Sequence, residues 1–465
     1  MTPSKSLLCF TIAAFGYSTS VTAAPGEWTP LFNGKDLTGW VQKGGKAEYR
    51  VENGEIVGRA VPKTPNSFLC TDREYADFIL EFELKVDPRL NSGVQFRSTY
   101  SETPTSYEWQ GKTINVPANR FHGYQSEIDP DPKRNRMWTA GIYDEGRRGW
   151  LYPGALGGNN ERFSEAGRTL TKQEEWNKVR IVAVGNHIST FLNGHPRAAI
   201  TDNLTSKGLI GLQVHSINNE ELVGAEVRWR NLRIMEIVPT ESLSAEEIAN
   251  GWAPLWDGKT TEGWISAKAD SFPTKGWVIE DGVLTVLGEG GGDIVTRERY
   301  SAFELSLEFK MTEAANSGIK YFCQNNLDLK TGAILKGNKG SSIGLEYQIL
   351  DDNKHPDAKN GRDGNRTLGS LYDLITSKKE GIASGVGTWH TAVIKTDGTK
   401  VEHFLNGELI VSYDRTSEEF KALVAKSKYK NIPGFGAWDD GHILLQDHGD
   451  NVSFRNIKFR IPAEK

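Results

Sequence analysis

Large apolar side chains alternate with polar ones along much of the chain, and this alternation predicts β-strands with one buried face. In residues 78–86 every second side chain is apolar, whereas Glu81, Glu83 and Lys85 point to the opposite side. Residues 303–311 repeat the arrangement. Strands of this kind form antiparallel sheets whose apolar faces make a core and whose polar faces point outward.

Turn residues separate the strand-like runs. Asn-Gly at 53–54 and 193–194, and Asp-Gly at 281–282, are typical of two-residue β-hairpin turns. Helical periodicity is rare, and the main exception is a helix expected over residues 416–428. Ser-x-x-Glu at 244–247 is a capping-box pattern that predicts the start of one further short helix. The pattern as a whole indicates an all-β protein.

The first half of the sequence returns in the second half. Residues 28–40, WTPLFNGKDLTGW, return at 252–264 as WAPLWDGKTTEGW, and Asn-Ser-Gly occurs at both 91–93 and 316–318. The order of the shared motifs is kept, and a shift of about 225 residues relates the two halves. We therefore expect two domains that descend from one duplicated ancestor.

The ends of the repeats define the expected segments. Lys5, the apolar run that follows it and the small residues at 21–24 are typical of a secretory signal peptide, which predicts a secreted or periplasmic protein. The expected segments are a signal peptide at 1–24, a first β-sandwich at 25–238, a linker at 239–250 and a second β-sandwich at 251–465.

Length and charge narrow the class of protein. A chain of 465 residues exceeds the usual size of one domain. A net charge of -5 provides no basic surface for nucleic acid, and no second long apolar run predicts membrane insertion. Cys70 and Cys323 are expected to be buried thiols rather than a disulfide. The sequence leaves the oligomeric state open.

Three sets of polar residues recur in both halves at alternating or neighbouring strand positions. In the first half they are Gln125, Glu127 and Asp129, then Tyr143-Asp144, then Gln213 with His215. Their counterparts are Glu346 and Gln348, then Tyr372-Asp373, then Gln446 with His448. Residues two apart on a strand share a face, so each half presents an acid beside an amide. A solvated strand face or a turn cap is the alternative reading of each set.

The motifs together resemble the 3-keto-disaccharide hydrolase family over nearly all of both halves, from about 27 to 237 and from about 251 to 461. The opening PLFNGKDLTGW, the Asn-Ser-Gly triplet and the GYQSEID run at 123–129 carry this resemblance. It implies two tandem concanavalin A-like jelly-roll β-sandwiches with few short helices. It also implies cleavage of carbohydrate substrates, namely glycosides already oxidised at C3.

Such chemistry needs a base for the C2 proton, an electrophile for the enolate oxygen and an acid for the leaving group. The candidate catalytic residues are Glu127, Tyr143, Asp144, His215, Glu346, Tyr372, Asp373 and His448. The candidate substrate-binding residues are Asn91, Gln125, Asp129, Arg147, Arg148, Trp150, Gln213, Asn316, Gln348 and Gln446. A divalent metal ion held by acid and His side chains could take the electrophile's role, and no other cofactor is expected.

Three other functions remain open from the sequence. A pair of lectin-like domains would bind sugars without chemistry. A conventional glycosidase would need two carboxylates flanking the scissile bond, and no such pair recurs on one strand in both halves. The third possibility is that one half is catalytically active while the other is structural or sugar-binding. The charged loop at 144–150 favours the first half as the active one.

Overall fold

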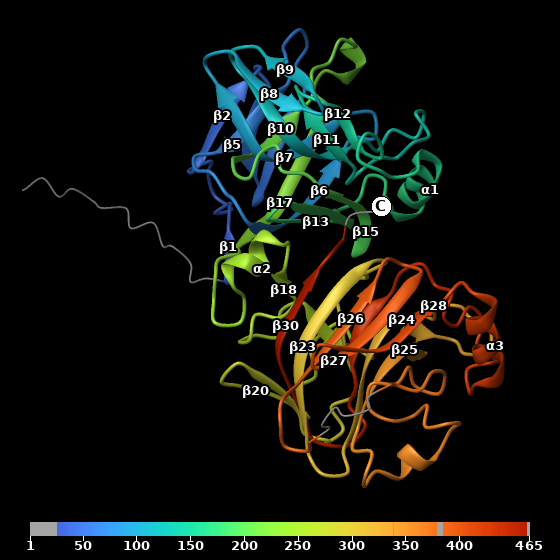
Figure 1. Ribbon diagram of the computed structural model, residues 1–465. Coiled ribbons are helices and arrows are strands. Elements are labelled where there is room, and N and C mark those ends of the chain that lie inside the picture. The colour runs from blue at the N-terminus through green and yellow to red at the C-terminus, as the bar shows by residue number, and fades with distance from the viewer. Residues whose placement is uncertain (1–25, 338, 379–384, 463–465) are drawn as a thin grey trace, which may run out of the picture.

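The computed structural model describes residues 26–337, 339–378 and 385–462, and the predicted signal peptide lies outside them. Two antiparallel β-sandwiches follow one another along the chain, which confirms the predicted all-β class and tandem arrangement. Figure 1 shows the first sandwich above the second, with the short helix α2 (Ala245–Ala249) at their junction.

Each sandwich has a back sheet and a front sheet. The first back sheet has the order β15 (His195–Thr201), β14 (His187–Leu192), β13 (Asn177–Val184), β6 (Phe78–Val86), β17 (Glu226–Glu236), β4 (Glu55–Arg59) and β3 (Glu48–Glu52), with β1 (Trp28–Pro30) beside β17. The first front sheet has the order β12 (Gly149–Tyr152), β11 (Ile142–Glu145), β10 (Arg120–Ile128), β7 (Ser92–Ser101), β16 (Leu209–Val214), β5 (Ser67–Thr71) and β2 (Trp40–Gly44).

The second sandwich keeps this plan with a narrower front sheet. Its back sheet has the order β20 (Trp277–Glu280), β21 (Val283–Val286), β30 (Val452–Arg460), β23 (Phe303–Met311), β26 (His390–Thr396), β27 (Lys400–Leu405) and β28 (Glu408–Asp414), with β18 (Ala253–Pro254) beside β30. Its front sheet has the order β19 (Trp264–Ser266), β22 (Ile294–Thr296), β29 (His442–Leu445), β24 (Asn316–Leu327) and β25 (Ser341–Leu350).

A few small elements complete the described chain. They are the hairpin β8 (Thr105–Trp109) and β9 (Lys112–Val116), the helices α1 (Asn160–Leu170) and α3 (Glu418–Lys426), and the 3-10 turns η1 (Glu220–Leu222) and η2 (Pro356–Lys359). The capping box predicted at Ser244 and Glu247 is present at α2. The helix expected over 416–428 spans Glu418–Lys426 and is capped by Ser417.

The alternation of apolar residues places the core between the two sheets of each sandwich. In the first sandwich Phe82 from β6 and Trp229 from β17 share one buried cluster with Phe96 from β7 and Tyr124 from β10. Every second residue of these strands therefore points inward, and the residues between them point away from the core. On the front sheets those intervening positions carry the polar residues that recur in both halves.

The outer face of the first back sheet is covered by the second sandwich. Ile79 and Phe191 belong to the same buried cluster as the second sandwich's core. Glu81, which alternation assigns to the solvent, is only 2% exposed because it pairs with Arg180 at 2.8 Å and Arg233 at 2.6 Å. Arg180 also pairs with Glu298 of the second sandwich at 2.8 Å. The expectation of a solvated strand face is wrong at Glu81, since a domain interface lies there.

Candidate functional site

The recurring polar residues of the first half meet on the outer face of the first front sheet. Gln125 lies opposite Tyr143 on one neighbouring strand and opposite Gln95 on the other. Glu127 lies opposite Gly93, and Gly93 lies opposite Gln213. Directly opposed residues in an antiparallel pair share one face of the sheet. The structure therefore brings together residues that are more than a hundred positions apart in the sequence.

Glu127 is the centre of this patch. The residue is 4% exposed, and its carboxyl group accepts hydrogen bonds from the side-chain amides of Asn91 and Gln125, the latter at 2.9 Å. Burial raises the pKa of Glu127 to about 7, even though these two hydrogen bonds act in the opposite direction. A carboxyl group poised near neutral pH can both take up and return a proton, as a general acid-base catalyst requires.

The glycine of the Asn-Ser-Gly motif makes room for this arrangement. A Cβ atom at Gly93 would clash with the side chain of Gln125, which lies directly over it. The same triplet in the second half places Gly318 under the side chain of Glu346. The motif thus has a steric reason in both halves, because any larger residue would displace the acid-amide pair.

A cluster of aromatic and charged side chains lies beside Glu127. The ring of Tyr143 lies 5.2 Å from that of Trp150, and Trp150 lies 4.5 Å from Trp138. The guanidinium group of Arg136 lies over both tryptophans and binds the carboxylate of Asp129. Asp129 is therefore neutralised within the protein, and Trp150 and Tyr143 are half-buried beside the acid.

Two predicted residues of the third set lie at the same end of the sheet. Gln213 is fully buried, and among the described residues neither its amide oxygen nor its amide nitrogen has a hydrogen-bond partner. His215 lies just beyond the end of β16, and its Nδ1 lies 2.8 Å from the carbonyl oxygen of Ser216. A buried amide without partners is costly and is a common feature of ligand sites.

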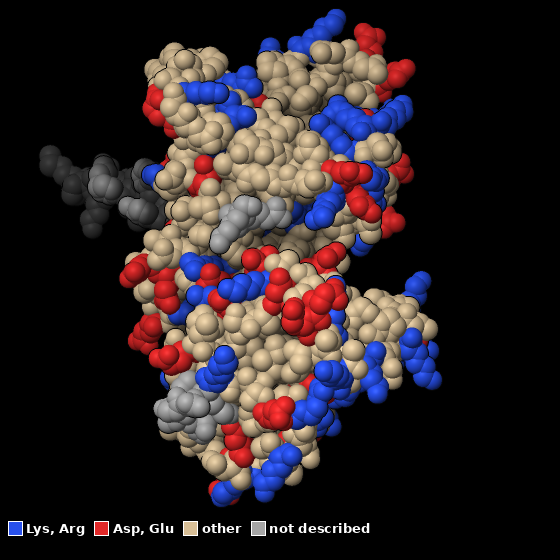
Figure 2. Space-filling model, turned by 45° about the vertical axis from the view of Figure 1, so that its right-hand side comes forward, with Lys and Arg blue, Asp and Glu red and all other residues tan. Residues whose placement is uncertain are grey.

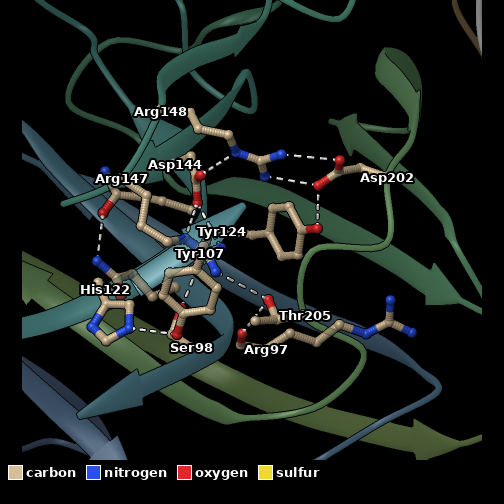
Figure 3. A network of polar contacts seen from close by, with 12 residues as sticks. Arg97, Ser98, Tyr107, His122, Tyr124, Asp144, Arg147, Arg148, Asp202 and Thr205 are labelled. Atoms are coloured by element: carbon tan, nitrogen blue, oxygen red, sulfur yellow. Dashed lines mark hydrogen bonds and ion pairs between the residues drawn. The ribbon is translucent and has the colours of Figure 1, made fainter. Parts of the chain in front are cut away.

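Asp144, Arg147 and Arg148 do not join the patch. Asp144 lies opposite Tyr124, whose ring is in the core, so its carboxylate points away from the face that carries Glu127. It pairs with Arg147 at 2.6 Å and with Arg148 at 2.5 Å, and Arg148 pairs further with Asp202 (Figure 3). These arginine side chains are at most 1% exposed. The structure places the three residues in a buried ion-pair cluster on the opposite side of the sheet from Glu127, and the catalytic and substrate-binding roles expected for them stay predictions.

The front sheet of the second half has the same strand positions around the Asn-Ser-Gly glycine, but different polar residues occupy them. Tyr372 donates its backbone N–H to the carbonyl of Glu346, as expected for the position that Tyr143 occupies. Gln348 lies opposite Gly318 and donates to the side chain of Asn316 at 3.2 Å. The acid and the amide have therefore exchanged positions between the two halves.

Other predicted residues of the second half lie around these positions. Asp373 pairs with Arg366 at 2.8 Å, much as Asp144 pairs with Arg147 and Arg148. The backbone N–H of Gln446 donates to the Gly318 carbonyl, and its side-chain oxygen is buried without a partner. His448 is exposed, with its ring 6.4 Å from that of His355.

Sequence reasoning missed three residues of these sites. Gln95 and its counterpart Lys320 lie two positions after the glycine of each Asn-Ser-Gly motif, on the same strand face. That spacing was the available signal for both. Arg136 lies in the loop after β10, where no periodicity predicts its contact with Asp129 and the tryptophans.

A metal site is not evident in the described part of the chain, where no three His, Cys, Asp or Glu side chains gather as a metal would require. Within the same residues no helix is long and apolar enough to cross a membrane. Cys70 and Cys323 are buried and free, as predicted. On the face shown in Figure 2, acidic and basic side chains are interspersed over both sandwiches.

Two antiparallel sandwiches, each with an acid-amide pair on its front sheet, define a tandem β-sandwich protein with a candidate site in each half. The chain belongs to the family described as the 3-keto-alpha-glucoside-1,2-lyase-like domain, which it matches twice, at residues 27–235 and 251–460. The two matches correspond to the two sandwiches.

This chain is also similar to three individual proteins. A 3-keto-disaccharide hydrolase from Bacteroides thetaiotaomicron is 33% identical over 262 residues, which cover 52% of this chain and 89% of that protein. The crystal structure of a predicted glycosyl hydrolase from Parabacteroides distasonis is 29% identical and covers 48% of this chain and 98% of its own, with a TM-score of 0.40. A second such structure from the same organism is 26% identical, covers 45% and 99%, and has a TM-score of 0.35.

Proposed function

We propose that this chain is an exported hydrolase that cleaves the glycosidic bond of 3-keto-glycosides, including 3-keto-disaccharides. The observation that carries the proposal is the buried Glu127, whose pKa is raised to about 7. Among the described residues, its carboxyl group is hydrogen-bonded only by the side chains of Asn91 and Gln125. The family description, with its 1,2-lyase chemistry, and the 3-keto-disaccharide hydrolase relative supply the substrate class.

The reaction we propose begins with the proton on C2, which the neighbouring C3 ketone makes acidic. The Glu127 carboxylate takes this proton, and the electron pair of the C2–H bond forms the enolate of the ketone. The enolate then expels the C1 oxygen substituent, which leaves a C1–C2 double bond. The proton held by Glu127 passes to the leaving oxygen, and addition of water across the double bond completes a net hydrolysis.

Neighbouring groups support this sequence of steps. The side-chain N–H groups of Gln213 have no partner within the described protein and can donate to a sugar oxygen. Burial, together with the negative charges of Glu145 and Glu127, raises the pKa of Tyr143, so its phenol stays protonated and can donate to the leaving oxygen. Trp150 offers an aromatic surface of the type on which sugar rings stack.

The test is a paired incubation of the purified protein with a glucoside and with its 3-keto derivative, followed by release of the leaving group. We expect release from the keto form alone. Glu127→Gln, which keeps the hydrogen-bonding shape but removes the base, should lower the kcat/KM of the first sandwich by roughly 10²–10⁴-fold. Glu102→Gln, an exposed acid of the same sandwich, is the matched control and should retain full activity.

Other outcomes would redirect the assignment. Release from the unoxidised glucoside would indicate a conventional glycosidase. Binding of either sugar in calorimetry without release would indicate a lectin-like protein. Loss of release on adding a chelator would show that a metal ion takes part.

A further inference from the structure

The second front sheet carries a charged pair that the first lacks. Lys320 lies directly opposite Glu346, at the register position where the first half has Gln95 opposite Gln125. Both pairs lie one row from the glycine of the Asn-Ser-Gly motif. The duplicated frame thus holds two neutral amides in the first half and a carboxylate beside an ammonium group in the second.

Both side chains of this pair are buried, but their charged groups lack close partners. Lys320 is 8% exposed and Glu346 is 5% exposed, and neither side chain makes a hydrogen bond to another described residue. The nearest ion pair of Lys320 is with Asp293, at a long 3.9 Å. A structural pair in the same protein looks different, since Asp144 and Arg148 meet at 2.5 Å. Charged groups that are buried without close partners are energetically costly, and a bound ligand that supplies the partners would offset this cost.

The pKa values of both groups are shifted upward. Although burial opposes its charge, the carboxylates of Glu346 and Asp293 raise the pKa of Lys320, which keeps its ammonium group protonated. Burial raises the pKa of Glu346, while the charges of Lys320 and Lys428 act against that rise. The pair therefore offers a base beside a cation.

We propose that Glu346 and Lys320 form a second reaction centre for 3-keto-glycosides, in which Lys320 stabilises the enolate oxygen. This rests on the function proposed above and extends it to the second sandwich. Glu346 takes the C2 proton, and the electron pair of that bond becomes the C2–C3 double bond of the enolate. The negative charge moves to the C3 oxygen, which accepts a hydrogen bond from the Lys320 ammonium group. When the C1–O bond breaks, the proton on Glu346 passes to the departing oxygen.

The geometry gives Lys320 a role that no residue of the first centre has. Cationic donors aimed at developing negative charge are among the strongest catalytic groups, because a buried site weakens the competition from water. In the first half the equivalent Gln95 is neutral, so that centre relies on amide donors. The two sandwiches would then perform one reaction with two different stabilising groups.

The experiment uses the full chain with Glu127→Gln, which silences the first centre, and follows release from a 3-keto-glucoside. We expect residual turnover in this background, and a further loss of roughly 10²–10³-fold in kcat when Lys320→Gln is added. Lys320→Gln installs the residue type that the first half has at this position. Lys320→Arg, which keeps a cation, should restore part of the lost rate, and the exposed Lys421→Gln should change nothing.

Each outcome separates the two proposals. No release by the wild-type chain refutes the proposed function itself. Full activity of the wild type that disappears entirely with Glu127→Gln alone refutes only the second centre. Unchanged residual turnover in Lys320→Gln also refutes it. If Lys320→Gln lowers the melting temperature so far that it is unfolded in the assay, Glu346→Gln tests the same pair and should abolish the residual rate.

Discussion

The raised pKa of Glu127 has a measurable cost in stability. The folded protein holds this proton more tightly than the unfolded chain does, since the pKa rises from 4.5 to about 7. The free energy of unfolding must then fall as pH rises through this window, and it levels off above pH 7. At 1.36 kcal/mol for each unit of pKa, ionising Glu127 in the folded state costs roughly 3 kcal/mol.

Glu127→Gln removes this ionisation and keeps the size of the side chain. Relative to the wild type, the variant should gain about 2–3 kcal/mol of unfolding free energy between about pH 5 and about pH 8.5. The assay is urea unfolding followed by tryptophan fluorescence at both pH values, with Glu102→Gln as the control whose pH dependence matches the wild type. Parallel pH profiles for wild type and Glu127→Gln would refute the reasoning, because they would show that Glu127 ionises at its ordinary pKa.

Further predictions concern the rest of the molecule. Glu81→Gln should lower the free energy of unfolding by roughly 3–5 kcal/mol at neutral pH, since it leaves Arg180 buried with one partner fewer. Although burial acts against ionisation, nearby Arg180, Lys178 and Arg233 lower the pKa of Glu81 from 4.5 to about 2, so this contribution should be lost progressively as pH falls from about 4.5 through about 2. Asp144→Asn should lower the melting temperature before it changes kcat, and a kcat loss in a fully stable variant would support the catalytic role predicted for Asp144. Intact-mass measurement of the exported protein should show the loss of residues 1–24, and an intact N-terminus would contradict the signal peptide.

Much of the fold could be predicted because its determinants are local. The dipeptide Asn53-Gly54 joins β3 to β4 with φ angles of 53° and 78°, and glycine adopts the second without steric cost. Asn193-Gly194 and Asp281-Gly282 do the same between their strands. A two-residue turn fixes the register of its hairpin, so the sequence determines these pairs directly.

The burial of charged residues could not be predicted from local pattern. Glu81 alternates with apolar residues as a solvated position would, yet the second sandwich covers it. The loop at 144–149 is dense in charge, as a binding loop would be, yet its arginines are buried against Asp144 and the ring of Tyr124. In both cases the deciding contact comes from a distant segment, and composition alone does not reveal which charges meet a partner.

The exchange of acid and amide between the halves shows what the sheet frame contributes. Gln-x-Glu in β10 and Glu-x-Gln in β25 are visible in the sequence as related pairs, but only strand pairing reveals what faces each acid. Glu127 faces Gly93 and is hydrogen-bonded by two amides, whereas Glu346 faces Lys320. Since the acid moved by one row to the position opposite a lysine, its electrostatic partner changed while the glycine beneath stayed the same. The strand positions above the glycine therefore determine where a carboxylate can lie on the sheet. The residue that faces the carboxylate determines whether burial or a neighbouring charge dominates its pKa.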